Sequence, residues 1–319
     1  MAKKNKNTPL MITLLGPTAT GKTRLSALLA DYLDGEVISA DSRQVYKGMD
    51  VGTGKDYDDY VVNGRSIPVH LIDIVEPGYE YNVFEFQQDF LNVFKDITQR
   101  NKIPVLCGGT GLYLEAALSG YRMADVPENA ELRKKLSGKT YDELKEMLLS
   151  LRKTHNTTDL TERSRTLRAI EIAFFEQSRQ SDDKAFPEIN NRIFGIHFER
   201  EIIRKRITER LKKRLENGMI EEVKTLLASG LSPEQLSFYG LEYRYLTSYV
   251  TGEIPFEEMF RLLNTAIHQF AKRQMTWFRR MEKRGFKIIW VDGTKNEQEK
   301  LNEIVRHFER EETGKLIAL

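Results

Sequence analysis

The stretch that decides the fold is Gly16-Pro17-Thr18-Ala19-Thr20-Gly21-Lys22-Thr23, which fits the pattern G-x-x-x-x-G-K-[ST]. The apolar run 11–15 precedes it and leucines at helical spacing follow it, so we expect a strand, a loop and a helix in that order. In this context the glycines let the backbone wrap around an anion, and the N–H groups at the helix start face it. Lys22 adds a positive charge, and the Thr23 hydroxyl is a suitable ligand for Mg²⁺. The stretch predicts a phosphate loop for a ligand that contains a diphosphate.

Outward from this loop, short apolar runs without polar alternation are separated by helical patterns. Such runs are typical of parallel strands that are covered on both faces. They lie at 36–39, 69–75, 103–107, 192–198 and 287–291, with helical patterns at 84–100, 200–228 and 256–284. Between 127 and 175 the patterns are helical only. We therefore predict an α/β fold, a P-loop NTPase-like parallel sheet with helices on both faces, built from 1–120 and 190–319, with an inserted helical domain at 121–189.

The composition excludes several classes of protein. The 319 residues include 49 Lys and Arg and 47 Asp and Glu, and this balance argues against a histone-like nucleic-acid binder. No apolar run approaches the ~18 residues of a membrane-spanning helix. The single cysteine, Cys107, excludes an intramolecular disulfide and a cysteine-based zinc site. The basic N-terminus lacks the apolar core of a signal peptide, so we expect a cytoplasmic protein with no membrane partner.

A second candidate site residue, Asp41, follows the apolar run 36–39. It is therefore expected at the carboxyl edge of the sheet, where open α/β sheets bind their ligands. A carboxylate at this edge can accept a proton or hold metal-bound water. Asp and Ser are also both common helix N-caps. Position alone does not decide whether Asp41 is a site carboxylate or a helix N-cap.

Five further blocks accompany the phosphate loop. They are DSRQVYKGMDVGTGK at 41–55, HLID at 70–73 with Glu76-Pro77, GGTGLY at 108–113, SRTLRAIEI at 164–172 and AKRQMTWFR at 271–279. Each block alone is weak evidence, but their order around a phosphate loop is highly specific. Over most of its length the chain thus resembles the tRNA dimethylallyltransferases (tRNA isopentenyltransferases), in their shorter bacterial form.

The resemblance implies transfer of a dimethylallyl group from dimethylallyl diphosphate to N6 of the adenosine 3′ of the anticodon, in tRNAs that read codons starting with U. Residues 16–23 would bind the diphosphate, whose charge Lys22, Thr23 and Mg²⁺ would stabilise as the C–O bond breaks. Asp41 would accept the N6 proton or orient the amine, and Thr110 would face the same cleft. The implied catalytic residues are thus Asp41, Thr23, Lys22 and Thr110, with Thr23 as the metal ligand. A monomer would bind the tRNA anticodon loop.

The resemblance also implies which residues contact tRNA. They are Asp41, Ser42, Arg43, Gln44, Thr110, Ser164, Arg165, Arg168, Arg244, Gln269, Lys272, Arg273 and Gln274. The charge distribution suits an RNA partner, because 200–216 holds eight Lys and Arg against three acids and 271–287 holds seven against one. From spacing alone, Arg165 and Arg168 are a solvated basic stripe and Trp277 is a helix-packing residue.

Three alternatives stay open. An adenylate isopentenyltransferase would act on a free nucleotide, although it would not need the helical domain or the basic C-terminal helices. Another P-loop phosphotransferase would need only the phosphate loop. A non-enzymatic RNA-binding protein is disfavoured by the intact phosphate loop and Asp41. The sequence also departs from the family pattern, with Glu242 at a glycine position, His268 at an arginine position and Asp56 in place of a proline.

Overall fold

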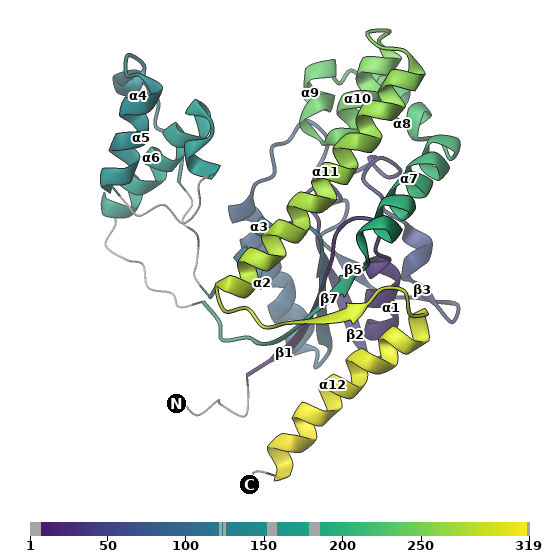
Figure 1. Cartoon of the computed structure of the whole chain (residues 1–319). Helices are drawn as coiled ribbons and strands as arrows, with labels where there is room; N and C mark the ends of the chain where they lie inside the picture. Colours follow the sequence, from purple (N-terminus) through teal and green to yellow (C-terminus); the bar gives the residue numbers. More distant parts are fainter. Residues whose placement is uncertain (1–7, 121–122, 124–125, 152–157, 179–185, 318–319) are drawn as a thin grey trace. The chain divides into compact units, whose positions relative to one another are not determined.

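The computed structural model describes residues 8–120, 123, 126–151, 158–178 and 186–317. The chain divides into two compact units (Figure 1). Unit 1 comprises Met1–Gly120 and Pro187–Leu319, and unit 2 comprises Tyr121–Phe186. The inserted domain predicted at 121–189 begins where unit 2 begins and extends slightly beyond its end.

Within the described residues, the main sheet of unit 1 has six strands in the order β5-β2-β6-β1-β7-β8, and all neighbours are parallel. The strands are β1 (Leu10–Leu15), β2 (Gly35–Ala40), β5 (Val69–His70), β6 (Ile103–Gly108), β7 (Asn190–His197) and β8 (Ile288–Asp292). β1, β2 and β6 are buried almost throughout, which explains their apolar runs without alternation. The predicted parallel α/β sheet is confirmed.

The three central strands end level with one another at one edge of the sheet. Leu15 of β1 pairs with Gly108 of β6, and Gly108 pairs in turn with Ala40 of β2. The segments that follow these strands therefore start side by side. They are the phosphate loop after β1, Asp41 after β2 and the turn containing Thr110 after β6.

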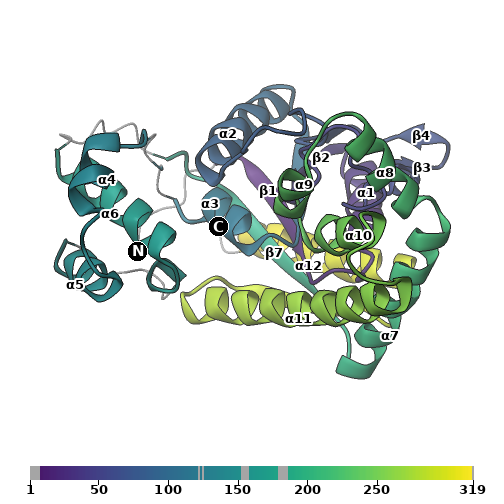
Figure 2. The same ribbon diagram turned by 90° about the horizontal axis from the view of Figure 1, so that it is seen from above.

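Helices cover both faces of this sheet (Figure 2). α1 and α12 pack on one face through a core that includes Leu25, Leu29 and Ile304. α2 and α3 lie on the other face, where the rings of Phe86 and Tyr113 stack with their centroids 4.0 Å apart. The bounds of these helices are α1 (Lys22–Tyr32), α2 (Val83–Gln99), α3 (Gly111–Leu118) and α12 (Glu297–Ile317).

A further group of helices packs beside the carboxyl edge of the sheet around a second core. This core includes Leu211, Val223, Leu246 and Leu263, and the turn after β2 contributes Tyr46 to it. The single helical block predicted at 200–228 is wrong in one respect, because Gly218, with a φ of +91°, ends the first helix and starts another. The helices are α7 (Arg200–Glu216), α8 (Met219–Ala228), α9 (Pro233–Phe238), α10 (Leu241–Val250) and α11 (Phe256–Lys283).

The strand predicted at 69–75 is also wrong beyond its first residues, because β5 ends at His70. Leu71 and Asp73 adopt left-handed backbone conformations, with φ of 62° and 55°, which a strand does not accommodate. The N–H of Asp73 donates to the carbonyl of Gln44 at 3.1 Å, so this segment pairs with the turn after β2. The remaining elements of unit 1 are the short helix η1 (Tyr57–Tyr60) and the hairpin of β3 (Val61–Val62) and β4 (Arg65–Ser66).

In its described residues, unit 2 contains helices and no strand, as the sequence predicted. They are α4 (Ala130–Leu136), α5 (Tyr141–Leu151), η2 (Thr158–Leu160) and α6 (Arg163–Ser178). Leu144 and Leu148 of α5 pack against Ala169 and Ile170 of α6 to form its core. Unit 2 therefore has a hydrophobic core of its own.

We expect Leu29→Ala to lower the free energy of unfolding of unit 1 by about 2–5 kcal/mol. Leu29 lies on α1 and is completely buried in the core that α1 forms with the sheet and α12. Leu112→Ala is the matched control, since Leu112 is 41% exposed on α3, and its effect should stay within about 0.5 kcal/mol. Urea unfolding followed by the fluorescence of Trp277 and Trp290, both in unit 1, measures the difference. Equal losses in the two variants would contradict this assignment of the core.

Candidate functional site

The phosphate loop joins β1 to α1 and curves as an anion-binding loop does. Ala19 and Gly21 have positive φ values of 64° and 76°, and Thr20 Oγ1 donates to the carbonyl of Pro17 at 2.9 Å. α1 starts directly after Gly21, and its first turn contains no acidic residue. The partial positive charge of the helix N-terminus is therefore left unneutralised by its own first turn, which favours a bound anion.

Helix α7 brings arginines to this loop. Arg206 Nε donates to the carbonyl of Ala19 at 2.9 Å, and Arg210 Nη1 donates to Thr18 Oγ1 at 3.0 Å. Arg214 lies one turn further along the helix. In the sequence, these three arginines are part of the basic segment 200–216. Their spacing of four residues, which places them on one helix face, is the signal that identifies them.

Positive charge is concentrated and partly buried at the loop. Burial lowers the pKa of the Lys22 ammonium, and Arg210 and Arg214 lower it further. Burial also lowers the pKa of Arg214 to about 10. Asp56, which replaces the family's proline, accepts from Arg210 Nη2 at 3.0 Å and from Arg214 Nη2 at 3.3 Å. A bound anion would favour the charged form of all three cations.

A small cavity adjoins the loop between α7 and α11. It is lined by Thr18, Ala19, Ile207, Arg210, Leu211, Arg214, Met219, Glu242 and Ile267. Burial raises the pKa of Glu242 in this cavity, which favours its neutral form. The lining places arginines and aliphatic side chains next to each other beside the phosphate loop.

The segments that follow β2 and β6 contact each other where these strands end. The N–H of Ser42 donates to Thr110 Oγ1 at 3.1 Å, and Asp41 Oδ1 accepts from the N–H of Arg43 at 3.0 Å. The residues after Asp41 form a turn and no helix, so its interpretation as a helix N-cap is wrong. Asp41 is close enough to Lys22 to act against the lowering of the lysine's pKa. The predicted carboxylate and the phosphate loop thus belong to one site.

Gln274 of α11 connects the phosphate loop to the turn after β6. The N–H of Thr18 donates to its Oε1 at 3.0 Å, and its Nε2 donates to the carbonyl of Gly109 at 2.9 Å. The side chain is buried, so both ends of its amide are used within the protein. The family resemblance implied a tRNA contact for Gln274. In the structure it sets the separation between the phosphate loop and Thr110.

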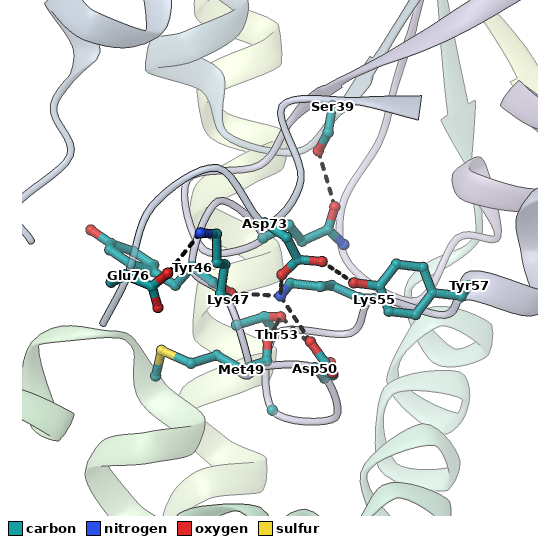
Figure 3. A network of polar contacts seen from close by, with 12 residues as sticks. Ser39, Tyr46, Lys47, Met49, Asp50, Thr53, Lys55, Tyr57, Asp73 and Glu76 are labelled. Atoms are coloured by element: carbon teal, nitrogen blue, oxygen red, sulfur yellow. Dashed lines mark hydrogen bonds and ion pairs between the residues drawn. The ribbon is translucent and has the colours of Figure 1, made fainter. Parts of the chain in front are cut away.

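A buried ammonium joins the turn after β2 to the turn after β5 (Figure 3). Lys55 Nζ donates to the carbonyl of Tyr46 at 2.5 Å and to Asp50 Oδ1 at 2.9 Å, and it also donates to Asp73. The hydroxyl of Tyr57 donates to the other oxygen of Asp73. Because the Lys55 side chain is completely buried, these acceptors replace water as its partners. The hydrogen bonds from Lys55 and Tyr57 to Asp73 also explain why the strand ends at His70 and the chain forms a turn there.

Gln44, another predicted tRNA contact, lies under the same turn and is only 8% exposed. Its Nε2 donates to the carbonyl of Gly54 at 3.0 Å, and its Oε1 accepts from Ser39 Oγ at 3.0 Å. Gln44 therefore links the end of β2 to the residue that precedes Lys55. This arrangement ties the position of Asp41 to that of the whole turn.

Glu222 of α8 belongs to no motif in the sequence, yet it holds the turn after β2. Its carboxylate accepts from the successive N–H groups of Asp50, Val51 and Gly52 at 2.7, 2.7 and 2.9 Å, and from the hydroxyl of Tyr243 at 2.7 Å. α8 thereby holds the turn after β2. Gly52 is required there, because any side chain would collide with the Tyr243 ring.

Other predicted tRNA contacts of unit 1 lie at its surface. Gln269, Lys272 and Arg273 are exposed on α11, and Arg244 is exposed on α10. The guanidinium of Arg273 lies 5.9 Å from the ring centroid of Phe270, which is itself 38% exposed. These side chains are accessible to a partner as large as an RNA.

The three predicted contacts of unit 2 lie on α6. Ser164 and Arg165 are exposed. Arg168 is partly buried, donates to Glu171 Oε2 at 3.2 Å and also donates to the carbonyl of Val126. The interpretation as a solvated basic stripe therefore fits Arg165, whereas Arg168 also stabilises unit 2.

Trp277 packs inside unit 1, as its spacing indicated. Its indole ring lies against Gly111, where a Cβ atom would overlap it, and the guanidinium of Arg280 lies 3.9 Å from its centroid. α11 is thus pressed against the start of α3, next to Thr110. The packing interpretation of Trp277 is confirmed.

Two kinds of feature are absent from the part of the chain that the structure describes. It contains no group of three or more His, Cys, Asp or Glu side chains arranged to hold a metal ion. It also contains no helix long and apolar enough to cross a membrane.

Comparison with known proteins gives a consistent result. A model of the IPP transferase family matches residues 44–281. The chain is 55% identical over 296 residues to the tRNA dimethylallyltransferase 1 of Parabacteroides distasonis, which covers 93% of this chain and 96% of the relative. It is 56% identical over 292 residues to the tRNA dimethylallyltransferase 2 of Bacteroides fragilis, with coverages of 92% and 95%.

Solved structures agree with these sequence matches. The full-length tRNA isopentenylpyrophosphate transferase of Bacillus halodurans superposes with a TM-score of 0.70 at 29% identity, covering 97% of this chain and 99% of its own. A eukaryotic dimethylallyltransferase acting on tRNA gives a TM-score of 0.73 over 90% of this chain and 75% of its own. At 22% identity, the second match supports the fold alone.

We expect Lys55→Met to lower the free energy of unfolding by about 1.5–3 kcal/mol, because it leaves the carbonyl of the buried Tyr46 and the partly exposed carboxylate of Asp73 without their charged partner. Lys47→Met is the matched control from the same turn (Figure 3). The Lys47 side chain is 50% exposed and pairs with Glu76 at 2.6 Å, so its loss should cost less than about 1 kcal/mol. Urea unfolding of both variants tests the difference, and similar costs would contradict the role given to Lys55.

Proposed function

This chain belongs to the IPP transferase family, and on that premise we propose that it transfers a dimethylallyl group from dimethylallyl diphosphate to tRNA. The acceptor is N6 of the adenosine 3′ of the anticodon, in tRNAs that read codons starting with U. The observation that carries the proposal is the meeting of two chemistries at one edge of the sheet. The phosphate loop with Lys22 suits a diphosphate, and Asp41 beside Thr110 suits an acceptor amine.

The phosphate loop receives the diphosphate leaving group. The N–H groups at the start of α1, together with Lys22 and Arg210, face an anion that gains charge as the C–O bond of the allyl group breaks. The aliphatic side chains of the adjoining cavity, including Ile207 and Met219, exclude water from an allylic carbon that becomes electron-poor. These contacts favour transfer over hydrolysis.

Asp41 handles the proton of the acceptor. As N6 of the adenosine forms its bond to the allylic carbon, the C–O bond to diphosphate breaks and the nitrogen loses one hydrogen. The Asp41 carboxylate accepts that proton. Its Oδ1 is oriented by the N–H of Arg43 at 3.0 Å, and Thr110 Oγ1 is held next to it by the N–H of Ser42.

The donor set of the site fits Mg²⁺. Thr23 follows Lys22 in the phosphate loop, and Mg²⁺ is commonly held by one or two protein oxygens together with substrate phosphates. Thr23 would hold the ion, with Asp41 as the nearby carboxylate. When bound, Mg²⁺ supplies positive charge that stabilises the departing diphosphate.

The proposed tRNA contacts are polar and basic side chains that are exposed or partly buried. We assign Arg43, Arg244, Gln269, Lys272 and Arg273 of unit 1 to phosphate and base contacts. Ser164, Arg165 and Arg168 of unit 2 would contact the same RNA, with Arg168 doing so beside its partner Glu171. The target adenosine must leave the stack of the anticodon loop to reach Asp41. A monomer in the cytoplasm suffices for this activity.

The proposal is tested by incubating the purified protein with Mg²⁺, unmodified bulk tRNA and radiolabelled dimethylallyl diphosphate, with AMP and ATP as parallel acceptors. Label in tRNA alone is the expected result. Label in AMP or ATP would assign the chain to the adenylate isopentenyltransferases. ATP turnover without prenyl transfer would identify a P-loop phosphotransferase.

We expect Asp41→Asn to reduce prenyl transfer by about 10²- to 10⁴-fold, because an amide cannot accept the N6 proton. The affinity for tRNA should stay unchanged, since Asn retains the oxygen that accepts from Arg43. Single-turnover rates and filter binding measure the two quantities separately. Asp58→Asn, at an exposed position of η1, is the control. A loss of binding as large as the loss of rate would exclude Asp41 as the base.

We expect Lys272→Ala and Arg273→Ala each to weaken tRNA binding and to reduce the slope of log K against log salt by about 0.7 to 0.9, the value for one lost phosphate contact. Both side chains are exposed on α11. Lys95→Ala removes a similarly exposed cation from α2 and should leave the slope unchanged. Binding measured at several salt concentrations tests this, and an unaltered slope in the α11 variants would place them outside the interface.

A further inference from the structure

Phe238, the last residue of α9, is an aromatic side chain that the core does not use. It leaves 47% of its surface exposed, whereas Leu236 is completely buried and Tyr239 is only 3% exposed. α9 thus already has apolar side chains for its core, and Phe238 adds none to it. A single exposed aromatic side chain is common on a protein surface, so its role depends on how it is held and on what lies beside it.

The ring of Phe238 is held against buried residues. It meets the ring of Tyr239 edge-on, with centroids 5.5 Å apart and planes at 84°. Tyr239 in turn meets Tyr46 edge-on at 4.6 Å, and its hydroxyl accepts from the N–H of Gly78. Because its neighbour is fixed in this way, Phe238 presents its ring at low entropic cost.

A guanidinium accompanies this ring. The central carbon of Arg43 lies 5.7 Å from the Phe238 centroid, within the range of a cation–π contact. The N–H of Arg43 donates to Asp41 Oδ1 at 3.0 Å, so the pair begins two residues from the residue assigned as the base. An exposed aromatic ring beside an arginine matches an unpaired nucleobase and its phosphate better than it matches an apolar protein surface.

We propose that Phe238 and Arg43 together form a stacking platform for an unpaired base of the tRNA anticodon loop, one that neighbours the target adenosine. This inference rests on the proposed function and deepens it. The ring stacks on the base, and the guanidinium pairs with the adjacent phosphate. The platform contributes to holding the loop open while the target base occupies the site beside Asp41.

The experiment compares Phe238→Ala, Phe238→Leu and Phe238→Trp in the full-length protein. For Phe238→Ala we expect a 5- to 140-fold increase in the Kd for an anticodon stem-loop, the range for one lost stacking contact, with little change in kcat at saturating RNA. Trp should restore the affinity, because it stacks, whereas Leu should not. Phe256→Ala is the matched control, since Phe256 is 38% exposed and also meets a tyrosine edge-on.

A spectroscopic readout tests stacking itself. Stem-loops carrying 2-aminopurine at single anticodon-loop positions should show one position that is quenched by the wild-type protein and released by Phe238→Ala. Full affinity in Phe238→Leu, or no position that responds to Phe238→Ala, would overturn the platform. The wild-type transfer assay separates the two hypotheses. If wild type labels tRNA and Phe238→Ala binds normally, the platform fails alone, and if wild type labels no tRNA, the proposed function fails.

Discussion

The parallel register of β2, β6 and β1 is the constraint on which the site depends, because it brings three segments distant in the chain to the same level of one edge. Ala40, Gly108 and Leu15 pair across these strands, and the chain leaves each strand into a segment that carries chemistry. In a parallel sheet all carboxyl ends meet at one edge, so the phosphate loop, Asp41 and Thr110 become neighbours without any dedicated interaction. The sheet thus sets their approximate distance.

Buried polar side chains refine that distance. Gln274 bridges Thr18 and Gly109, Glu222 accepts three backbone N–H groups of the turn after β2, and Lys55 joins that turn to Asp73. Each such hydrogen bond stabilises the fold only modestly, but losing one partner leaves a buried polar group unsatisfied. The loops are therefore held more rigidly than surface loops usually are, and the proposed function requires such rigidity, because it aligns a carboxylate with a leaving group.

Charge is divided between two tasks. Arg210 and Arg214 of α7 lie at the phosphate loop and are partly buried, and burial strengthens their effect on a small anion. The cations of α11 are exposed, where solvent weakens each contact but a long polyanion can engage many. Under the proposed function, a nearly neutral chain thus binds a small diphosphate and an RNA through different helices.

The sequence by itself determined the sheet, the phosphate loop, the helical insertion and the position of Asp41 at the sheet edge, because apolar periodicity and glycine spacing are local properties. The strand predicted at 71–75 is wrong. The ion pair between Lys55 and Asp73 joins two separate turns, and such a contact leaves no signal in the local apolar pattern. The tRNA contacts of Gln44 and Gln274 were implied only by the family resemblance, and the structure shows both amides hydrogen-bonded within the protein. The sequence did not single out Arg206, Arg210 or Glu222. The contacts of these side chains involve residues up to 256 positions away in the chain. Only the packing of α7, α8, α9 and α11 beside the sheet decides which side chains are buried between the loops and which stay exposed at the surface.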